Sequence, residues 1–301
     1  MSKTNNKKVS IFSYYGPYKG LLALDLFFAT LGASVTLVMP LIVRYITGTV
    51  IYEESGAAWQ TIVRLSVLML VLLLVELGCN FYITYWGHLM GARMEYGMRN
   101  DIFGHYQKLA FTFYDNQKVG QLMSRVTNDL FDITELLHHG PEDIIISLIK
   151  IVGALVILGH INMRLTILTA CFLPFILAFA LYLNKRMKRV FKENRVKMAD
   201  INGQIEDNLS GIRVVKSFAN EDIEMRKFKK GNERFLATKR RSYLYMGTYQ
   251  SVLNAMLTAV TIVVVLAGSR LIVDGNMAIP DLITFLLYIA NFTEPVKKLI
   301  N

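Results

Sequence analysis

Six long apolar segments dominate this sequence and constrain its fold more than any other feature. They cover roughly residues 20–46, 61–90, 143–161, 163–183, 245–273 and 282–300. About 20 mostly apolar residues are enough for a helix to cross the hydrocarbon core of a bilayer. A helix also satisfies its backbone hydrogen bonds internally, as lipid requires. The sequence therefore predicts an all-α membrane protein with six long transmembrane helices.

Composition agrees with this class, since 53% of the 301 residues are hydrophobic and the mean hydropathy is +0.37. These values are too apolar for an ordinary soluble domain. Residues 1–19 carry positive charges before the first apolar segment but show no cleavage-site pattern. We expect them to be a retained N-terminal segment rather than a removed signal peptide.

The basic residues indicate the orientation of the chain in the membrane. The formal net charge is +10, and 26 of the 33 lysines and arginines lie in the segments 1–19, 91–129 and 185–245. With six spans these segments fall on one side, which the positive-inside rule makes cytoplasmic. We therefore expect a multi-pass plasma-membrane protein with both termini in the cytoplasm. Anionic lipid is the expected partner of these charges, and nucleic acid is not expected.

Two long connections, about residues 91–135 and 185–244, are predicted to be helical hairpins rather than loops. Both keep apolar residues at three- and four-residue spacing and contain no proline. At 1.5 Å per residue, residues 93–108 would project about 24 Å and residues 185–211 about 39 Å from the membrane. The chain must reverse at the tip of each hairpin.

The tips carry turn-forming and aromatic residues. At the first tip, Asp115 and Asn116 can cap a helix, Gly120 permits a close approach, and Arg125 and Asp129 stand four residues apart, a helical pairing distance. The second tip has Gly211 before a short apolar run and Phe218 near its end. Each tip could be a docking surface for a soluble protein or simply a solvated turn, and these residues alone leave both readings open.

Three stretches resemble one family. The stretch "FYDNQKVGQLMSRVTND" resembles the first intracellular loop of six-helix ATP-binding cassette (ABC) exporters, "GIRVVKSFANEDIEMRKF" resembles their second loop, and "ITFLLYIANFTEPVKKL" resembles their sixth helix. The order and spacing match over essentially the whole chain. The resemblance implies the type I exporter (type IV transporter) fold. Residues 1–19 would then form the N-terminal elbow segment, and residues 20–301 the transmembrane domain.

In that family each intracellular loop carries a short coupling helix that docks on a nucleotide-binding domain. The resemblance places these helices at about residues 114–122 and 208–215. It also implies a homo- or heterodimer of transmembrane domains, with helices four and five reaching the partner subunit's nucleotide-binding domain. The coupling residues it implies are Tyr114, Asp115, Asn116, Gly120, Gln121, Leu122, Asn208, Ser210, Gly211, Arg213, Val214 and Phe218.

The sequence contains no G-x-x-x-x-G-K-[ST] motif, so it lacks the loop that would cradle the phosphates of ATP. The stretch "LSGIR" at 209–213 lacks the second glycine and the glutamine of the family's signature motif. We expect no cofactor or catalytic site in this chain, and ATP with Mg²⁺ on a nucleotide-binding domain outside it. That domain would either follow in a longer polypeptide, which we expect, or be a separate chain. The complete protein would then be an ATP-hydrolysing translocase.

Charged and aromatic residues inside the spans are candidates for a substrate pathway. Charges in lipid usually face an interior or a partner, and Asp25, Glu76 and Lys150 are such residues, although packing pairs are the simpler reading. Aromatic side chains could line a cavity for a hydrophobic or amphipathic cargo such as a drug, lipid or peptide. The predicted pathway residues are Glu76, Phe81, Tyr85, Phe285 and Tyr288.

The remaining chemistry is sparse. His138 and His139 are adjacent, so they point in different directions on a helix, and no acidic or sulfur partner stands at ligand spacing from them. We therefore expect no metal site. Cys79 and Cys171 lie in apolar segments and are expected to be buried thiols. Two other functions stay open. One is a non-transporting receptor or scaffold whose hairpins bind a regulatory partner. The other is an ion-coupled secondary transporter, which the few intramembrane acids and unbroken spans disfavour.

Overall fold

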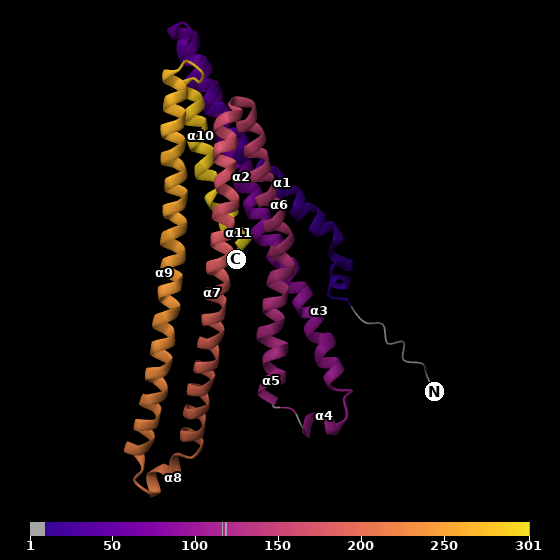
Figure 1. Ribbon diagram of the computed structural model, residues 1–301. Coiled ribbons are helices and arrows are strands. Elements are labelled where there is room, and N and C mark those ends of the chain that lie inside the picture. Colours follow the sequence, from indigo (N-terminus) through magenta and orange to yellow (C-terminus); the bar gives the residue numbers. More distant parts are fainter. Residues whose placement is uncertain (1–9, 116, 118, 301) are drawn as a thin grey trace. The chain divides into compact units, whose positions relative to one another are not determined.

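The computed structural model describes residues 10–115, 117 and 119–300, and helices are the only regular secondary structure among them. The chain divides into two compact units. The first comprises residues 1–163 and 268–299, and the second comprises residues 164–267 with the last two residues. The predicted all-α class is confirmed (Figure 1).

The first unit is organised around α1, which packs against α2, α6 and α10. In chain order its elements are the 3₁₀ helix η1 (Ile11–Tyr18), α1 (Lys19–Gly48), the short η2 (Val50–Tyr52), α2 (Ser55–Tyr82), the π-helical η3 (Ile83–Gly87), α3 (His88–Tyr106), α4 (Phe111–Asp115), α5 (Val119–Ser124), the π-helical η4 (Arg125–Asp129), α6 (Leu130–Ile161), α10 (Ile279–Asn291) and α11 (Thr293–Ile300). Because η3 joins α2 to α3 without a break, residues 55–106 form one continuous helix.

Helices run well beyond the apolar segments, as the hairpin prediction requires. Five helices among the described residues are long and apolar enough to cross a membrane. The sixth predicted span is divided at Phe292 into α10 and α11, so the count of six is approximate. Pro280 and Asp281 stand in the first turn of α10, where the sequence places a helix start. The Asp281 carboxylate accepts a hydrogen bond from the Ala278 amide at 3.3 Å.

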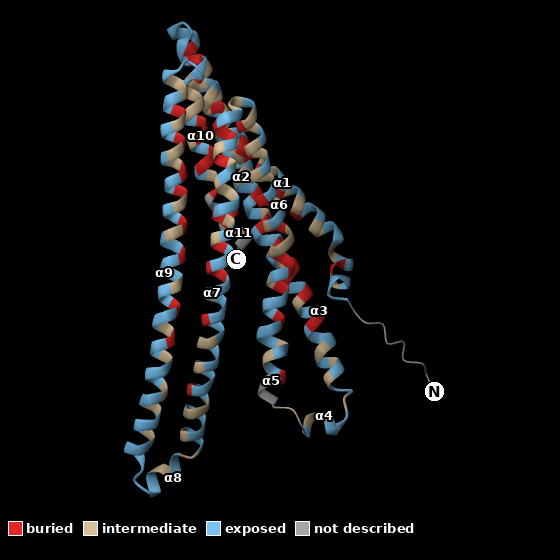
Figure 2. Ribbon diagram, viewed as in Figure 1, coloured by how far each residue is buried: buried red, intermediate tan, exposed pale blue. Residues whose placement is uncertain are grey.

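Buried residues of the first unit fall into clusters that tie its helices together (Figure 2). One cluster joins η1, α3 and α6 through Tyr15, Met90, Met94, Met98, Leu130 and Leu137. A second cluster joins α1, η3 and α6 through Ala29, Ala33, Ile83 and Ile146. On α10, Phe285 and Tyr288 are completely buried. The Tyr288 hydroxyl donates to the carbonyl oxygen of Leu37 on α1 at 2.5 Å.

Ion pairs connect helices of the first unit at both ends of its spans. Arg44 on α1 contacts Asp281 on α10 at 2.7 Å. Lys150 on α6 contacts Glu294 on α11 at 2.8 Å, and Lys298 contacts Asp143 at 2.9 Å. The structure therefore supports the interpretation of Lys150 as a residue that pairs with a neighbouring helix and stabilises packing.

The second unit is a hairpin of α7 (Met163–Ser210) and α9 (Glu221–Val273), joined at its tip by α8 (Ile212–Ser217) (Figure 1). The two long helices have 48 and 53 residues. Pro174 lies inside α7, whereas α9 contains no proline. Cys171 is exposed on α7, so its prediction as a buried thiol is wrong. Cys79 is buried on α2 as expected. The error arises because an apolar segment does not reveal which of its faces packs within the chain.

Candidate functional site

The tip of the α7–α9 hairpin is built by two close turns around α8. Gly211 separates α7 from α8, and its carbonyl oxygen accepts hydrogen bonds from the amides of Val214 and Val215 at 2.9 and 3.1 Å. A Cβ atom at Gly211 would lie 3.1 Å from the Asp207 carbonyl oxygen, which explains a glycine at this sharp turn. The turn at Gly211 therefore places the short helix α8 across the end of the α7–α9 hairpin.

The second turn, between α8 and α9, contains a left-handed residue, Ala219, with φ 51°. The Asn220 amide closes this turn by donating to the Val215 carbonyl oxygen at 3.0 Å. Left-handed backbone costs roughly 1–2 kcal/mol for a residue with a Cβ atom.

Changing Ala219 tests this turn. We expect Ala219→Gly to keep the turn intact, because glycine adopts this φ freely, and Ala219→Val to open it, because β-branching crowds the left-handed region. Amide hydrogen exchange at residues 218–220 measures the effect. Faster exchange in the glycine variant than in the valine variant would contradict the expectation.

Two ion pairs stabilise the tip of the α7–α9 hairpin. Lys216 on α8 contacts Glu221 on α9 at 2.9 Å, and this ammonium holds the pKa of Glu221 below its ordinary value by hydrogen bonding. The Lys227 ammonium, 2.6 Å from Glu224, likewise lowers the pKa of Glu224. A lowered carboxyl pKa means that the pair stabilises the tip above the ordinary glutamate pKa. That contribution is lost as the pH falls through the lowered value.

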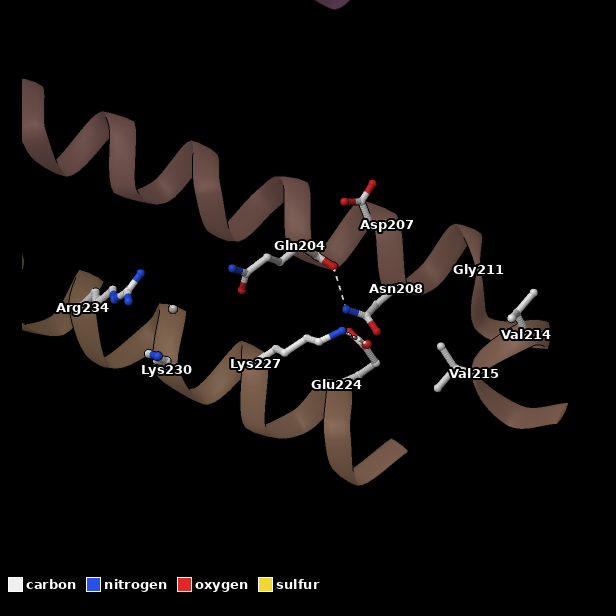
Figure 3. Close-up of a pocket in the computed structure, with 11 residues that line it drawn as sticks. Gln204, Asp207, Asn208, Gly211, Val214, Val215, Glu224, Lys227, Lys230 and Arg234 are labelled. Atoms are coloured by element: carbon white, nitrogen blue, oxygen red, sulfur yellow. Dashed lines mark hydrogen bonds and ion pairs between the residues drawn. The ribbon is translucent and has the colours of Figure 1, made fainter. Parts of the chain in front are cut away.

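A polar groove of about 720 Å³ lies between α7 and α9 just above the tip (Figure 3). Three cations and two carboxylates line it, namely Lys227, Lys230, Arg234, Asp207 and Glu224. The Asn208 amide donates to the Gln204 carbonyl oxygen at 3.0 Å inside it. A Cβ atom at Gly231 would lie 2.7 Å from Oε1 of Gln204, so a glycine allows the two helices to approach here.

The same tip carries apolar residues that the chain itself does not cover. A pocket of about 270 Å³ is lined mainly by Ile205, Leu209, Ile212, Val215, Met225 and Phe228. Beside it, Phe218 is 71% exposed and Val214 is 62% exposed. A group of exposed apolar residues at the end of a charged hairpin is typical of a protein interaction surface.

The first tip is formed by α4 and α5. The Tyr114 hydroxyl donates to the Tyr106 carbonyl oxygen and so fastens α4 to the end of α3. The rings of Phe113 and Tyr114 meet edge to face, with centroids 5.2 Å apart. Phe111 and Met123 expose most of their side chains. This tip therefore also presents apolar surface beyond a hairpin.

The tips differ from the predicted boundaries. The first is two short helices, α4 and α5, where one helix over 114–122 is predicted. The second short helix covers Ile212–Ser217, so Asn208 and Ser210 lie in the last turn of α7. Arg125 and Asp129 are the two ends of the π-helical η4, and they form no ion pair with each other in this described segment. The wider π turn replaces the α-helical spacing that the prediction assumes.

The predicted coupling residues take several environments. Asp115, Ser210, Arg213, Val214 and Phe218 are exposed, whereas Asn208 and Gly211 are half-buried. Leu122 is buried, and the half-buried Tyr114 is held by α3. Asn116 lies outside the described residues. For Gly120 and Gln121 the structure describes only the helical backbone of α5.

The predicted pathway residues do not share one environment. Phe285 and Tyr288 are buried packing residues of α10. Phe81 and Tyr85 are exposed and stack on each other with centroids 5.9 Å apart. The half-buried Glu76 accepts a hydrogen bond from the Thr36 hydroxyl at 3.4 Å. A pathway role for these five stays a prediction.

Comparison with known proteins decides the family. Residues 22–296 match the family described as ABC transporter transmembrane region. This chain belongs to that family. Membership accounts for the multi-pass helical architecture.

Relatives of this ABC transmembrane domain are about twice its length. It is 38% identical to the uncharacterized ABC transporter ATP-binding protein YwjA of Bacillus subtilis, over 96% of this chain and 50% of that protein. It is 23% identical to the putative multidrug export ATP-binding/permease protein YgaD of the same organism, over 95% of this chain and 50% of that protein. A protein of that description from Staphylococcus aureus is 24% identical over 91% of this chain and 48% of its own length. The ABC transmembrane domain thus spans about half of the relatives that it matches.

Sequence reasoning missed the apolar pocket at the second tip of this ABC domain. Its signal is present, because Leu209, Ile212 and Val215 recur every three residues across the Gly211 turn, and Met225 and Phe228 repeat that spacing on α9. The chain reversal that brings the two rows together is not visible in the sequence pattern.

Proposed function

We propose that this ABC transmembrane domain forms half of the alternating-access pathway of an ATP-driven exporter and docks its hairpin tips on nucleotide-binding domains. The main support for this proposal is the uncovered apolar surface at the second tip. Phe218 and Val214 are exposed there, at the end of a long, charged hairpin. Single exposed apolar residues are common, but a group of them gathered at one place is typical of a surface that a partner covers.

The geometry supports a mechanical role for the hairpins. Helices α7 and α9 run without a break from the tip into the apolar segments, so a displacement at α8 is carried along both. In the proposed cycle, ATP brings two nucleotide-binding domains together outside this chain, and the docked tips move with them. The pathway then changes between inward-open and outward-open arrangements. Nucleotide can shift this equilibrium only by favouring one arrangement over the other.

The partners follow from the same proposal. A second transmembrane domain completes the pathway, and the long hairpins and both termini lie in the cytoplasm. Two of the relatives are named as putative multidrug export proteins. We therefore propose a hydrophobic or amphipathic cargo for this domain as well.

Charged residues at the tip test the docking. In the transporter that carries the nucleotide-binding domains, Val214→Asp with Phe218→Asp is expected to reduce cargo-stimulated ATPase activity and transport at least tenfold. The reason is that two carboxylates must then lose their water at the docking surface. Reconstituted liposomes with a panel of hydrophobic cations, lipids and peptides provide both measurements.

A matched control lies on the same hairpin. Leu236 on α9 is 66% exposed but distant in sequence from the tip, so Leu236→Asp is expected to leave coupling unchanged. Normal coupling in the double tip variant would refute the docking proposal. Equal losses in the control and tip variants would also count against it, because they would indicate a general effect of added charge.

A further inference from the structure

Five side chains with metal-binding chemistry converge in the first unit. Asp25 comes from α1, His88 from the start of α3, and His138, His139 and Glu142 from α6. The ring centroids of His88 and His138 are 4.8 Å apart, and those of His138 and His139 are 4.5 Å apart. The cluster therefore joins three helices at one point.

Three of these side chains are deeply buried and carry polar atoms that have no hydrogen-bond partner in the described part of the chain. Asp25 and His138 are 1% exposed, and Glu142 is 5% exposed. Among the described residues nothing forms a hydrogen bond with either Asp25 carboxylate oxygen, either His138 ring nitrogen or Oε2 of Glu142. Buried polar groups are normally satisfied, because leaving them unpaired is costly. This arrangement indicates that the cluster has a ligand.

The backbone leaves room for the donor groups. Gly87 ends the π-helical η3 beside the cluster, and a Cβ atom there would lie 2.3 Å from Cε1 of His138 and 3.0 Å from Oδ1 of Asp25. At Gly91, one turn later, a Cβ atom would lie 3.6 Å from the His138 Cβ atom. The glycines at the end of η3 and the start of α3 thus leave space around His138 that the side chain of any other residue would occupy.

We propose that Asp25, His138 and Glu142 bind a divalent first-row transition-metal ion such as Zn²⁺. One donor atom from each residue lies within 4.8 Å of the other two. Donors of a tetrahedral zinc site lie about 3.3 Å apart, so modest side-chain rotation brings these three into range. One imidazole and two carboxylates suit a cation of this class, and its two positive charges balance the two buried carboxylates.

The two other histidines lie at the open side of the site. His88 is exposed and His139 is partly exposed, and both offer a ring nitrogen within 4.8 Å of a His138 nitrogen. Either can supply a fourth ligand or receive the ion from water. Carboxylate oxygens of Glu135 and Glu142 lie 3.5 and 3.9 Å from the two ring nitrogens of His139, and their negative charge favours a cation beside this ring.

Metal binding by the purified chain tests the proposal directly. The chain is prepared in detergent with a histidine-free affinity tag, stripped with a chelator and titrated with Co²⁺, whose visible absorption reports ligand geometry. Zn²⁺ is then added as a competitor, and bound metal is counted by mass spectrometry. We expect one ion per chain, with affinity reduced roughly 100-fold or more in His138→Gln and at least tenfold in Glu142→Gln.

Matched variants separate binding from folding. His160→Gln changes another histidine of α6, whose ring contacts the Val156 carbonyl oxygen, and is expected to bind metal normally. Gly87→Ala keeps every donor atom but crowds His138, so it is expected to weaken binding. If His138→Gln aggregates, Asp25→Asn with Glu142→Gln takes its place. A wild-type chain that retains no more Co²⁺ than the variants overturns the site, as would full binding in Glu142→Gln and Asp25→Asn.

Discussion

Replacing Phe285 by alanine is expected to lower the free energy of unfolding by about 3–5 kcal/mol, the range for a fully buried phenylalanine. Phe285 is completely buried on α10, a helix that packs against α1 and α6 in the first unit. In lipid, helix association depends on close packing rather than on escape from water, so the cavity left by the ring is not compensated by the bilayer. Unfolding of the purified chain in mixed micelles with increasing denaturing detergent measures the loss.

Leu287 on the same helix provides the comparison for Phe285. It is 36% exposed, so Leu287→Ala is expected to cost less than about 1 kcal/mol. Equal destabilisation by the two substitutions would show that burial of one face of α10 does not account for the loss, since alanine raises the helix propensity at both positions.

The second large effect is expected at Gly153, where α6 passes α1. A Cβ atom at this position would lie 2.4 Å from Cδ1 of Leu37 and 3.7 Å from its Cγ atom. Overpacking of this contact costs about 1–3 kcal/mol, whereas alanine gains about 1 kcal/mol of helix propensity inside α6. Gly153→Ala is therefore expected to destabilise the first unit by up to about 2 kcal/mol. The change also disturbs α10, because the Leu37 carbonyl oxygen accepts the hydrogen bond from the buried Tyr288.

A double-mutant cycle tests the contact between Gly153 and Leu37. Leu37→Ala alone creates a cavity, but in the Gly153→Ala background it also removes the clash. The double variant should therefore be more stable than the sum of the single effects, by about 0.5–3 kcal/mol. Additive unfolding free energies would mean that the methyl group at position 153 is accommodated elsewhere and that Leu37 does not limit the approach of α6.

The sequence was sufficient for the helical class because spans need only length and apolar composition. It also identifies the start of α10, since Pro280 and Asp281 act through local backbone chemistry. Local patterns could not predict the break between α4 and α5 or the π turns, because an inserted residue changes the hydrogen bonding without a distinct residue pattern. The burial of Phe285 depends on which face of α10 meets its neighbours, which an almost uniformly apolar helix does not encode.

The proposed metal site could likewise be predicted from the sequence only in its local part. His138 and Glu142 are four residues apart and share a helix face, so this pair is readable from the sequence. Asp25 and His88 reach the cluster only through packing of α1 and α3 against α6. The expectation that no metal binds rests on the adjacency of His138 and His139 and on the absence of an acidic or sulfur partner at ligand spacing. It overlooks Glu142 and does not consider the distant donors Asp25 and His88.

The two long helices of the second unit respond unequally to bending. At 1.5 Å per residue the 53 residues of α9 extend about 80 Å with its hydrogen-bond ladder free of proline, whereas Pro174 removes one donor from α7 in its apolar part. We therefore expect α7 to bend more easily than α9, and to do so near Pro174, while both helices still carry a displacement away from α8. If α7 bends at this point and α9 does not, the two helices must shift along each other by an amount that grows with the angle of the bend.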